Sequence, residues 1–289
     1  MTAREWLEKA KKEKFAIGAF NVGNLETFKA IVLAAANKKS PIIIETSPGE
    51  TDWLGEDNIV DLAKNYSQDY GIPILVNLDH AQTLAECILA IEAGFDLVHF
   101  DGSKLPLEEN IKITKEVVEI AHQKGILVEG EIDHIAGSSE VHSGSAESEI
   151  KNIPMTDPVR AEKFVSETGI DILAAFFGNV HGVFEQGGEN LDLEVLKKLA
   201  EKLPNTYFSL HGGSGIPEEQ VKEAIRYGIE KVNINTEMRQ AFKKEMMEVL
   251  ANNPDEIAMY KIEKPVVAKI AEIVENKIEV FGSGGKIYG

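Results

Sequence analysis

The sequence has little of several features that mark whole classes of protein. Its 289 residues include a single cysteine, Cys87, which excludes an internal disulfide framework and suits a reducing compartment. It has no run of about 18 apolar residues and no apolar signal core near Met1, so we expect neither a membrane span nor a secretory signal. These absences predict a cytoplasmic protein.

Positive charge is also scarce. The chain has 30 lysines and arginines against 48 aspartates and glutamates, which gives a net charge of −18. A field of this sign repels phosphate backbones and anionic lipids, so we expect neither nucleic acid nor a membrane surface as a partner. A polyanionic small molecule would need positive potential concentrated at one place on the chain.

Short apolar runs alternate with longer amphipathic segments along the whole chain. The apolar runs predict eight strands, at residues 15–21, 41–47, 72–79, 97–101, 126–132, 172–178, 207–211 and 231–235. Several are almost continuously hydrophobic, as expected for strands that are covered on both faces. Between them, apolar side chains recur three and four residues apart, which is typical of amphipathic helices.

Eight strand-then-helix units without a linker predict one domain, residues 1–289, with the (β/α)8 TIM-barrel fold of the α/β class. A Rossmann-type sheet is the alternative, but no glycine-rich turn follows the first strand. We expect residues 2–13 to form a helix that closes the bottom of the barrel, and residues 263–277 to form an extra helix outside it. The polar stretch 137–147 follows the fifth strand and predicts a mobile loop on the active-site face.

Functional groups in such a barrel come from the carboxyl ends of its strands. Three of the seven histidines, His80, His181 and His211, stand at such ends, after the third, sixth and seventh strands. Three histidines at one mouth form the ligand set of an open divalent metal site, for which zinc is favoured. A lone strand-end histidine is more often structural, so the prediction depends on all three together. The other histidines are left without a role: His99, His122, His134 and His142.

Two glycine- and hydroxyl-bearing segments predict a phosphate site. His211-Gly212-Gly213-Ser214-Gly215 leads from the seventh strand into a helix, and Asn233-Ile234-Asn235-Thr236 leads from the eighth strand into another. The loops after these two strands are the recurrent phosphate site of this fold, because backbone N–H groups and helix N-termini converge there.

Four segments taken together resemble the signature segments of class II ketose-bisphosphate aldolases, a family that includes fructose-1,6- and tagatose-1,6-bisphosphate enzymes. These segments are Asn77-Leu78-Asp79-His80, Gly178-Asn179-Val180-His181-Gly182, and the two predicted phosphate segments. The resemblance extends from the N-terminal helix to about Gly282. It implies a lyase that reversibly cleaves a ketose 1,6-bisphosphate, with fructose first and tagatose next, to dihydroxyacetone phosphate and glyceraldehyde 3-phosphate.

The resemblance also implies roles for individual residues. His80, His181 and His211 would hold Zn²⁺, and Asp79 would exchange the proton of the C4 hydroxyl. A second divalent metal would use Asp101 and Glu131, and a monovalent cation is a further cofactor. Residues of the substrate pocket would be Asn21, Ser47, Gly182, Gly212, Ser214, Asn233, Asn235 and Thr236. The family's members associate, which implies a homodimer or homotetramer.

Three positions depart from the family pattern. Ser139 aligns with a loop glutamate that moves the substrate proton, so we predict that Glu140, one residue later, takes that role, with Glu147 and Glu149 as fallbacks. Phe184-Glu185-Gln186 stands where a lysine is common in fructose-bisphosphate members. Asn235 replaces an aspartate that one subclass carries.

Other functions remain open at this point. A metal-dependent hydrolase would use the same histidines, but such barrels commonly begin with His-x-His on the first strand. A Schiff-base aldolase needs a lysine at the inner end of a strand, whereas we interpret Lys231 and Lys104 as solvated surface charges. An aldolase for another ketose phosphate is a further alternative. So is a catalytically impaired barrel that only binds a sugar phosphate.

Overall fold

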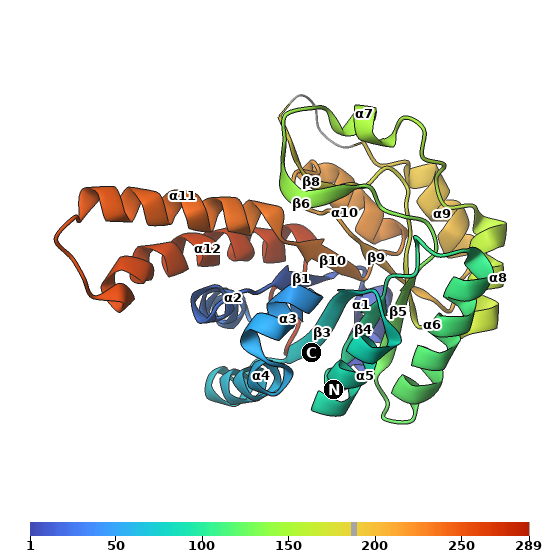
Figure 1. Ribbon diagram of the computed structural model, residues 1–289, viewed down its shortest axis with the longest axis horizontal. Helices are drawn as coiled ribbons and strands as arrows, with labels where there is room; N and C mark the ends of the chain where they lie inside the picture. The colour runs from blue at the N-terminus through green and yellow to red at the C-terminus, as the bar shows by residue number, and fades with distance from the viewer. Residues whose placement is uncertain (186–189, 289) are drawn as a thin grey trace.

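A closed barrel of eight parallel strands forms the centre of the chain, and helices surround it (Figure 1). The computed structural model describes residues 1–185 and 190–288. The barrel strands are β1 (Ile17–Asn21), β2 (Ile42–Thr46), β3 (Ile74–Ala81), β4 (Leu97–Phe100), β5 (Leu127–Glu131), β7 (Ile172–Ala174), β9 (Tyr207–Leu210) and β10 (Lys231–Ile234). They follow one another around the barrel in sequence order, and β10 pairs with β1 to close it. The predicted TIM barrel is confirmed, with every predicted strand in place.

Helices connect successive strands on the outside of the barrel, as the apolar spacing predicts. They are α2 (Leu25–Lys38), α3 (Pro48–Leu54), α4 (Glu56–Tyr70), α5 (Leu84–Ala93), α6 (Leu107–His122), α8 (Pro158–Thr168), α9 (Leu193–Lys202) and α10 (Glu218–Tyr227). Gly71, Gly94, Gly169 and Gly228 end four of these helices in the left-handed conformation, which a residue without a Cβ adopts most easily.

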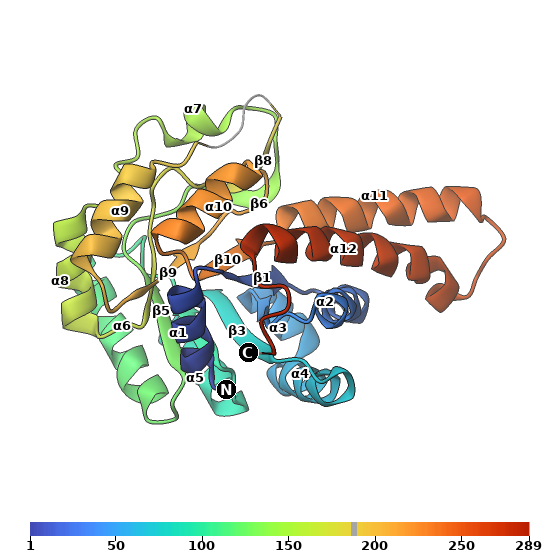
Figure 2. The same cartoon turned by 180° about the vertical axis from the view of Figure 1, so that it is seen from behind.

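The N-terminal helix α1 (Ala3–Glu13) closes one end of the barrel, on the side away from α7 (Ala146–Ile150) (Figure 2). Trp6 and Leu7 are buried there against strand residues such as Ile17 and Leu75. Burying a large apolar side chain contributes about 1.5–3 kcal/mol, so this layer anchors the bottom of the barrel. The predicted closing helix is therefore confirmed.

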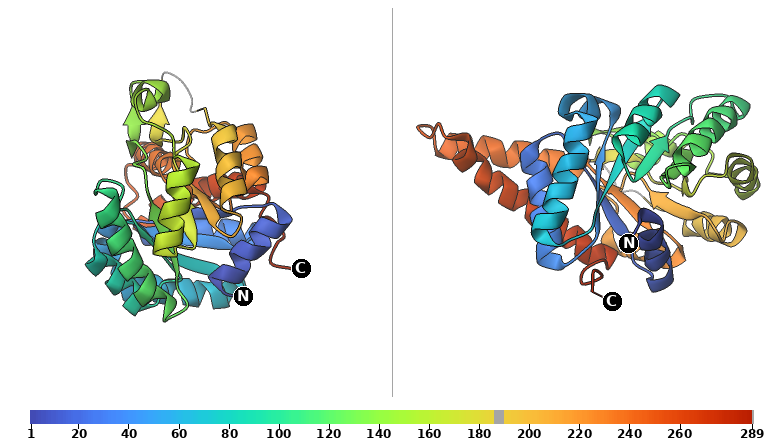
Figure 3. Two further views of the ribbon diagram at one scale, coloured as in Figure 1. Left: turned by 90° about the vertical axis from the view of Figure 1, so that its right-hand side faces the viewer. Right: turned by 90° about the horizontal axis from the view of Figure 1, so that it is seen from below.

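The last two helices extend away from the barrel as a hairpin (Figures 1 and 3). They are α11 (Thr236–Asn252) and α12 (Met259–Phe281), and α12 packs against α2 where it returns to the barrel. The extra helix predicted at 263–277 is therefore present and longer than expected. Within the described residues, no helix combines the length and the apolar character that crossing a membrane requires.

The polar stretch after β5 is more ordered in its backbone pairing than the sequence suggests. β6 (Gly137–His142) pairs in parallel with β8 (His181–Phe184), and α7 follows. The predicted loop over 137–147 therefore contains a short strand and one turn of helix, β6 and α7. The backbone of this stretch finds its partners more than 30 residues later, so no local sequence pattern shows the pairing.

Glu230, the residue before β10, is a buried carboxyl at the amino end of the barrel strands. Its Oε2 accepts a hydrogen bond from the Phe208 backbone N–H at 2.9 Å. Burial raises the pKa of Glu230 to about 7, although that N–H, Lys11 and Lys14 all act to lower it. The same carboxyl has a pKa near 4.5 in the unfolded chain, so between pH 4.5 and about pH 7 the native state keeps a proton that the unfolded state has lost. The free energy of unfolding therefore decreases as the pH rises through this range.

We predict that Glu230→Gln becomes more stable relative to wild type as the pH rises. The wild-type free energy of unfolding loses this proton's contribution up to about pH 7, whereas glutamine does not titrate. From pH 5.5 to pH 8 the free energy of unfolding of the variant minus that of wild type should rise by about 2 kcal/mol. Urea unfolding of both proteins in EDTA measures it, with the exposed Glu223→Gln as control. An unchanged difference between the two pH values would show that Glu230 titrates normally.

Candidate active site

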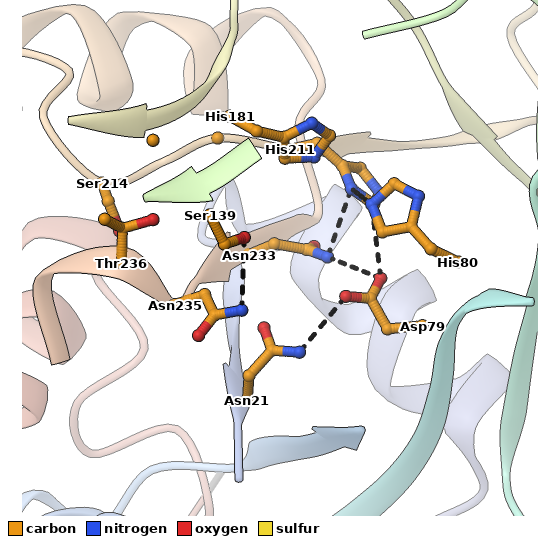
Figure 4. A pocket seen from close by; sticks show the side chains of 12 residues that line it. Asn21, Asp79, His80, Ser139, His181, His211, Ser214, Asn233, Asn235 and Thr236 are labelled. Atoms are coloured by element: carbon orange, nitrogen blue, oxygen red, sulfur yellow. Dashed lines mark hydrogen bonds and ion pairs between the residues drawn. The ribbon is translucent and has the colours of Figure 1, made fainter. Parts of the chain in front are cut away.

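An irregularity in β3 brings two neighbouring side chains to the same face of the barrel. Its pairing with β4 shifts between Leu78 and Ala81, and His80 adopts a positive φ of 55°. The His80 backbone N–H donates to His99 Nδ1 at 3.2 Å, which supports this conformation. In a regular strand, successive side chains point to opposite faces. Here Asp79 and His80 both reach the mouth of the barrel (Figure 4).

The three strand-end histidines meet in one pocket. The ring of His80 lies 4.9 Å from that of His181 and 4.7 Å from that of His211, centroid to centroid. His80 Nε2 and His211 Nδ1 are 3.1 Å apart. Two nitrogens on a tetrahedral zinc with bonds of about 2.0 Å would be about 3.3 Å apart.

Each ring has an acceptor at its other nitrogen. His211 Nε2 lies 2.7 Å from Glu129 Oε1, His80 Nδ1 lies 3.3 Å from Asp101 Oδ2, and His181 Nδ1 lies 3.3 Å from the Ile135 carbonyl oxygen. An N–H donated outward leaves the inner nitrogen with its lone pair facing the shared space. His181 Nε2 is buried there without a hydrogen-bond partner in the described chain. These residues therefore fit a divalent metal ion.

The protonation states of two of the three histidines suit metal binding, whereas Asp79 and Asp101 outweigh burial and raise the pKa of His80. Burial lowers the pKa of His211 to about 4, although Glu129 opposes the shift. Burial, reinforced by His80 and His211, holds the pKa of His181 well below its ordinary value. Both rings are therefore neutral near pH 7, and a neutral imidazole is the form that binds a metal.

Asp79 lies beside the histidines and is held by two amides. Asn21 Nδ2 donates to its Oδ2, and Asn233 Nδ2 donates to its Oδ1, both at 3.3 Å (Figure 4). Burial alone would raise the pKa of Asp79, but His80 and His99 outweigh it and hold that pKa well below its usual range. Asp79 is therefore an ionised, oriented acceptor at the edge of the histidine group.

His99 is a member of this group that the sequence analysis left without a role. It is fully buried on β4, with Nδ1 3.6 Å from Asp79 Oδ1 and Nε2 3.6 Å from Glu131 Oε2. One signal was available, because residues two apart in a strand share a face and Leu97 lies in the apolar layer inside the barrel. That alternation places His99 inside as well.

Asp101 and Glu131 also lie together, next to His80. His80 Nδ1 is 3.3 Å from Asp101 and 3.8 Å from Glu131. Burial, reinforced by the charge of Asp101, raises the pKa of Glu131 to about 8. One atom from each of the three residues falls within a 4.8 Å span, so the pair predicted for a second metal is brought together.

The loops after β9 and β10 form the wall of the same pocket. Gly212 has a φ of 68°, and a Cβ there would come within 1.8 Å of the Val180 carbonyl oxygen, so only glycine fits. Asn235 caps the N-terminus of α11, whose dipole and free N–H groups favour an anion. The predicted substrate residues that line this pocket are Asn21, Gly182, Gly212, Ser214, Asn233, Asn235 and Thr236.

Ser47 is the one predicted substrate residue that does not line this pocket. It precedes α3, and its hydroxyl donates to Glu50 Oε2 at 2.9 Å. Glu50 in turn accepts a hydrogen bond from Asn21. Ser47 is therefore linked to the pocket only indirectly, by hydrogen bonds through Glu50 and Asn21.

Lys231 is not the surface charge that the sequence analysis expected. It is fully buried inside the barrel, and its Nζ lies 2.8 Å from Glu129 and 3.4 Å from Glu45. Burial alone would lower the pKa of Lys231, but these two carboxylates outweigh it and raise that pKa. A permanently protonated amine is not a nucleophile, so Lys231 does not support a Schiff-base mechanism.

The stretch after β5 places Ser139, not Glu140, in the pocket. Ser139 lines the cavity and its Oγ is 3.4 Å from Asn235 Nδ2, whereas Glu140 is exposed. The alternation of strand β6 causes this difference, because neighbouring side chains face opposite ways. Glu147 is exposed on α7. Of the segment that replaces the family's lysine, Glu185 follows β8 and Gln186 lies outside the described residues.

Two of the remaining histidines, His122 and His142, make contacts outside the pocket. His122 Nε2 lies 2.8 Å from Asp171, a carboxylate that also accepts from Arg4 and the Val128 N–H. His142 stacks on Phe184 within the small β6–β8 sheet.

Comparison with known proteins gives one family. The model of the family described as fructose-bisphosphate aldolase class-II matches residues 1–286. The chain is 40% identical to the fructose-bisphosphate aldolase of Streptococcus pneumoniae, over 99% of each chain. It is 38% identical to that of Geobacillus stearothermophilus, over 99% of this chain and 98% of the relative. Among solved structures, the YdjI aldolase of Escherichia coli K12 matches with a TM-score of 0.81 and 31% identity, over 99% of each chain.

We predict that replacing any one of the three pocket histidines by alanine removes the bound metal. Each would supply one of three protein ligands, so its loss should leave a site too weak to survive dialysis. Inductively coupled plasma mass spectrometry of His80→Ala, His181→Ala and His211→Ala measures metal per chain. His122→Ala is the matched control and should retain wild-type content. A full equivalent of metal in all three pocket variants would contradict this ligand set.

Proposed function

The chain belongs to the class II fructose-bisphosphate aldolase family, and we propose that it reversibly cleaves a ketose 1,6-bisphosphate to dihydroxyacetone phosphate and glyceraldehyde 3-phosphate. The observation that carries this proposal is the meeting of three histidines, Asp79 and two phosphate-type loops in one pocket. Fructose 1,6-bisphosphate comes first because the named relatives are fructose-bisphosphate aldolases, and tagatose 1,6-bisphosphate comes next.

The family is metal-dependent, and we propose zinc as the metal of this chain, held by His80, His181 and His211. Three imidazoles with one position left for substrate are typical of catalytic zinc. When bound, the metal would supply Lewis-acid polarisation of the substrate's ketone carbonyl. We assign Asp101 and Glu131 to a second divalent metal and propose a monovalent cation as a further cofactor.

Asp79 would move the proton of the C4 hydroxyl. In cleavage it accepts that proton as the C3–C4 bond breaks, and in condensation it returns the proton to the aldehyde oxygen. Its lowered pKa keeps it ionised, and the Asn21 and Asn233 amides hold both carboxylate oxygens in place. A base that is already oriented loses little entropy when the substrate binds.

The phosphate of the dihydroxyacetone half would bind between the loops after β9 and β10. Backbone N–H groups around Gly212, the hydroxyls of Ser214 and Thr236 and the N-terminus of α11 supply donors without a buried cation. Gly182, Asn233 and Asn235 would complete this end of the pocket, and we assign Ser47 to the aldehyde half.

Glu140 would transfer the proton of the dihydroxyacetone phosphate carbon. This role requires the β6 stretch to shift so that Glu140 replaces Ser139 in the pocket, with the flanking Gly137 and Gly144 as pivots. A neutral serine hydroxyl is too weak a base for that step. Glu147 is the alternative carboxylate on the same segment.

We propose further that the chain is one catalytic domain, that it works in the cytoplasm, and that it assembles as a homodimer or homotetramer. The α11–α12 hairpin supports the last point, because apolar side chains stand exposed along it and at its tip: Met247, Leu250, Ile257, Met259 and Tyr260. Neighbouring exposed apolar groups are typical of surfaces that associate.

A coupled aldol-cleavage assay tests this function, and Asp79→Ala gives its sharpest form. We expect the zinc-loaded wild type to cleave fructose or tagatose 1,6-bisphosphate, to lose activity on chelation and to regain it with zinc. Asp79→Ala should keep its zinc and lose about 10²- to 10⁴-fold in rate, because a positioned proton-transfer group is gone.

The exposed Asp61→Asn on α4 is the control and should behave as wild type. Activity of Asp79→Ala within about threefold of wild type, about 0.7 kcal/mol on the barrier, would reject Asp79 as the base. Full activity in a metal-free preparation would reject the metal-dependent function altogether.

Glu140→Ala should slow exchange of the dihydroxyacetone phosphate proton with solvent by at least about 10²-fold while zinc stays bound, because the loop carboxylate is lost. Nuclear magnetic resonance in deuterium oxide measures this exchange directly. Unchanged exchange in Glu140→Ala with a collapse in Glu147→Ala would reassign the base. No effect from either substitution would favour the impaired sugar-phosphate-binding barrel.

A further inference from the structure

A second hollow of about 210 Å³ shares the lining residue Asn21 with the pocket of the three histidines. Its wall comes from the segment after β1, from the first turn of α2, from α3 and from the first turns of α11. The residues that define it are Asn24, Thr27, Glu50, Met238, Arg239 and Phe242. Its volume equals that of about seven water molecules in the liquid, which is enough for a short polyol chain.

Glu50 occupies the polar side of this hollow and uses the donors that face it. Its Oε2 accepts from the Ser47 backbone N–H and the Ser47 hydroxyl, both at 2.9 Å, and from Asn21 Nδ2 at 3.3 Å. Its Oε1 pairs with Arg239 at 2.5 Å. The Glu50 side chain is only 12% exposed, so solvent screens its charge weakly.

Glu50 also closes a capping box with Ser47 at the start of α3, a purely structural role. That role accounts for the contacts with Ser47. It does not require the contacts with Asn21 and Arg239, which come from β1 and α11 and direct the carboxylate toward the hollow.

The balance of charge in the hollow is unfavourable for a second phosphate. Within the described chain, Arg239 is the one cation that lines the hollow, and Glu50 neutralises it. A phosphate dianion would compete with Glu50 for Arg239 and for the Ser47 donors, and would lie next to a like charge. Hydroxyl groups face no such penalty, because they both donate to Glu50 and accept from Asn24 or Thr27.

The hollow also lies where the far end of the substrate should run. If the dihydroxyacetone phosphate end binds at the loops after β9 and β10, then Asp79 marks C4. The Asn21 amide bridges Asp79 and Glu50, so carbons beyond C4 pass Asn21 into the hollow.

We propose that Glu50 sets selectivity for the aldehyde half, and that the chain also cleaves ketose 1-phosphates whose far end is uncharged and hydroxylated. This inference rests on the proposed aldolase function. In cleavage the C3–C4 bond breaks, the C4 hydroxyl loses its proton and C3 gains one. The products are dihydroxyacetone phosphate and an aldehyde without phosphate, so no further reactant is needed.

The test compares two aldehydes in the condensation direction, glyceraldehyde 3-phosphate and unphosphorylated glyceraldehyde. In wild type we expect kcat/KM for the two within about tenfold of each other. Glu50→Gln keeps the capping box and removes the charge, and should shift the ratio toward the phosphorylated aldehyde by at least about tenfold, mainly through KM. Arg239→Gln, at a half-exposed residue, should shift the ratio the opposite way.

Asp52→Asn, which removes an exposed charge from the same helix, is the matched control and should leave the ratio at its wild-type value. A wild-type preference for the phosphorylated aldehyde above about 10³-fold that Glu50→Gln does not change would overturn the inference and leave the aldolase function standing. Collapse of that preference in Lys104→Met would also overturn the inference. Lys104 lines a different hollow, next to His80, so the phosphate would then bind there and not beside Glu50. No condensation with either aldehyde, together with no proton exchange in dihydroxyacetone phosphate, would instead reject the function on which the inference rests.

Discussion

The ion pair between Lys231 and Glu129, inside the barrel, is the interaction on which the site depends. Glu129 turns one oxygen to Lys231 at 2.8 Å and the other to His211 Nε2 at 2.7 Å and to the Ser209 hydroxyl. A buried carboxylate without the lysine would be left uncompensated, which typically costs about 3–5 kcal/mol. The lysine therefore keeps Glu129 charged, and Glu129 fixes which nitrogen of His211 faces the pocket.

The barrel supports this arrangement by separating its interior into two layers. Apolar side chains such as Leu7, Leu75 and Leu97 fill the end beneath α1. Ionisable groups fill the other end, where Glu45, Glu129 and Lys231 lie below the histidines. The apolar layer excludes water from below, so the charges above it interact strongly and hold one another in a single geometry.

The sequence was sufficient for the barrel, its closing helix and the meeting of the strand-end residues, because strand periodicity and fold topology determine all three. It failed where the deciding contact is distant in sequence. Lys231 is the first residue of β10, and only its partners on β2 and β5 reveal it as an interior residue. His99 lies before the end of β4, so only the alternation of side chains within that strand, and not its position at a strand end, identifies it as a residue of the interior.

The stretch 137–142 failed for the same reason, since its partner strand lies beyond α8. Ser139 faces the pocket and Glu140 faces solvent. The position of a residue in the sequence does not determine which side of a short strand faces the pocket. Glu50 carries no functional signal in the sequence, because a glutamate three residues after a serine is typical of a capping box. The pairing with Arg239 appears only when α11 is brought beside α3.

The β6–β8 pairing has a mechanical consequence. His181 begins β8, its backbone N–H donates to the Ala136 carbonyl, and its ring nitrogen Nδ1 is held by Ile135 on the segment that leads into β6. A displacement of β6 would therefore also move the His181 ring. The same two strands that would carry a carboxylate toward the substrate hold one corner of the histidine triangle, so the position of the loop and the shape of that triangle cannot vary independently.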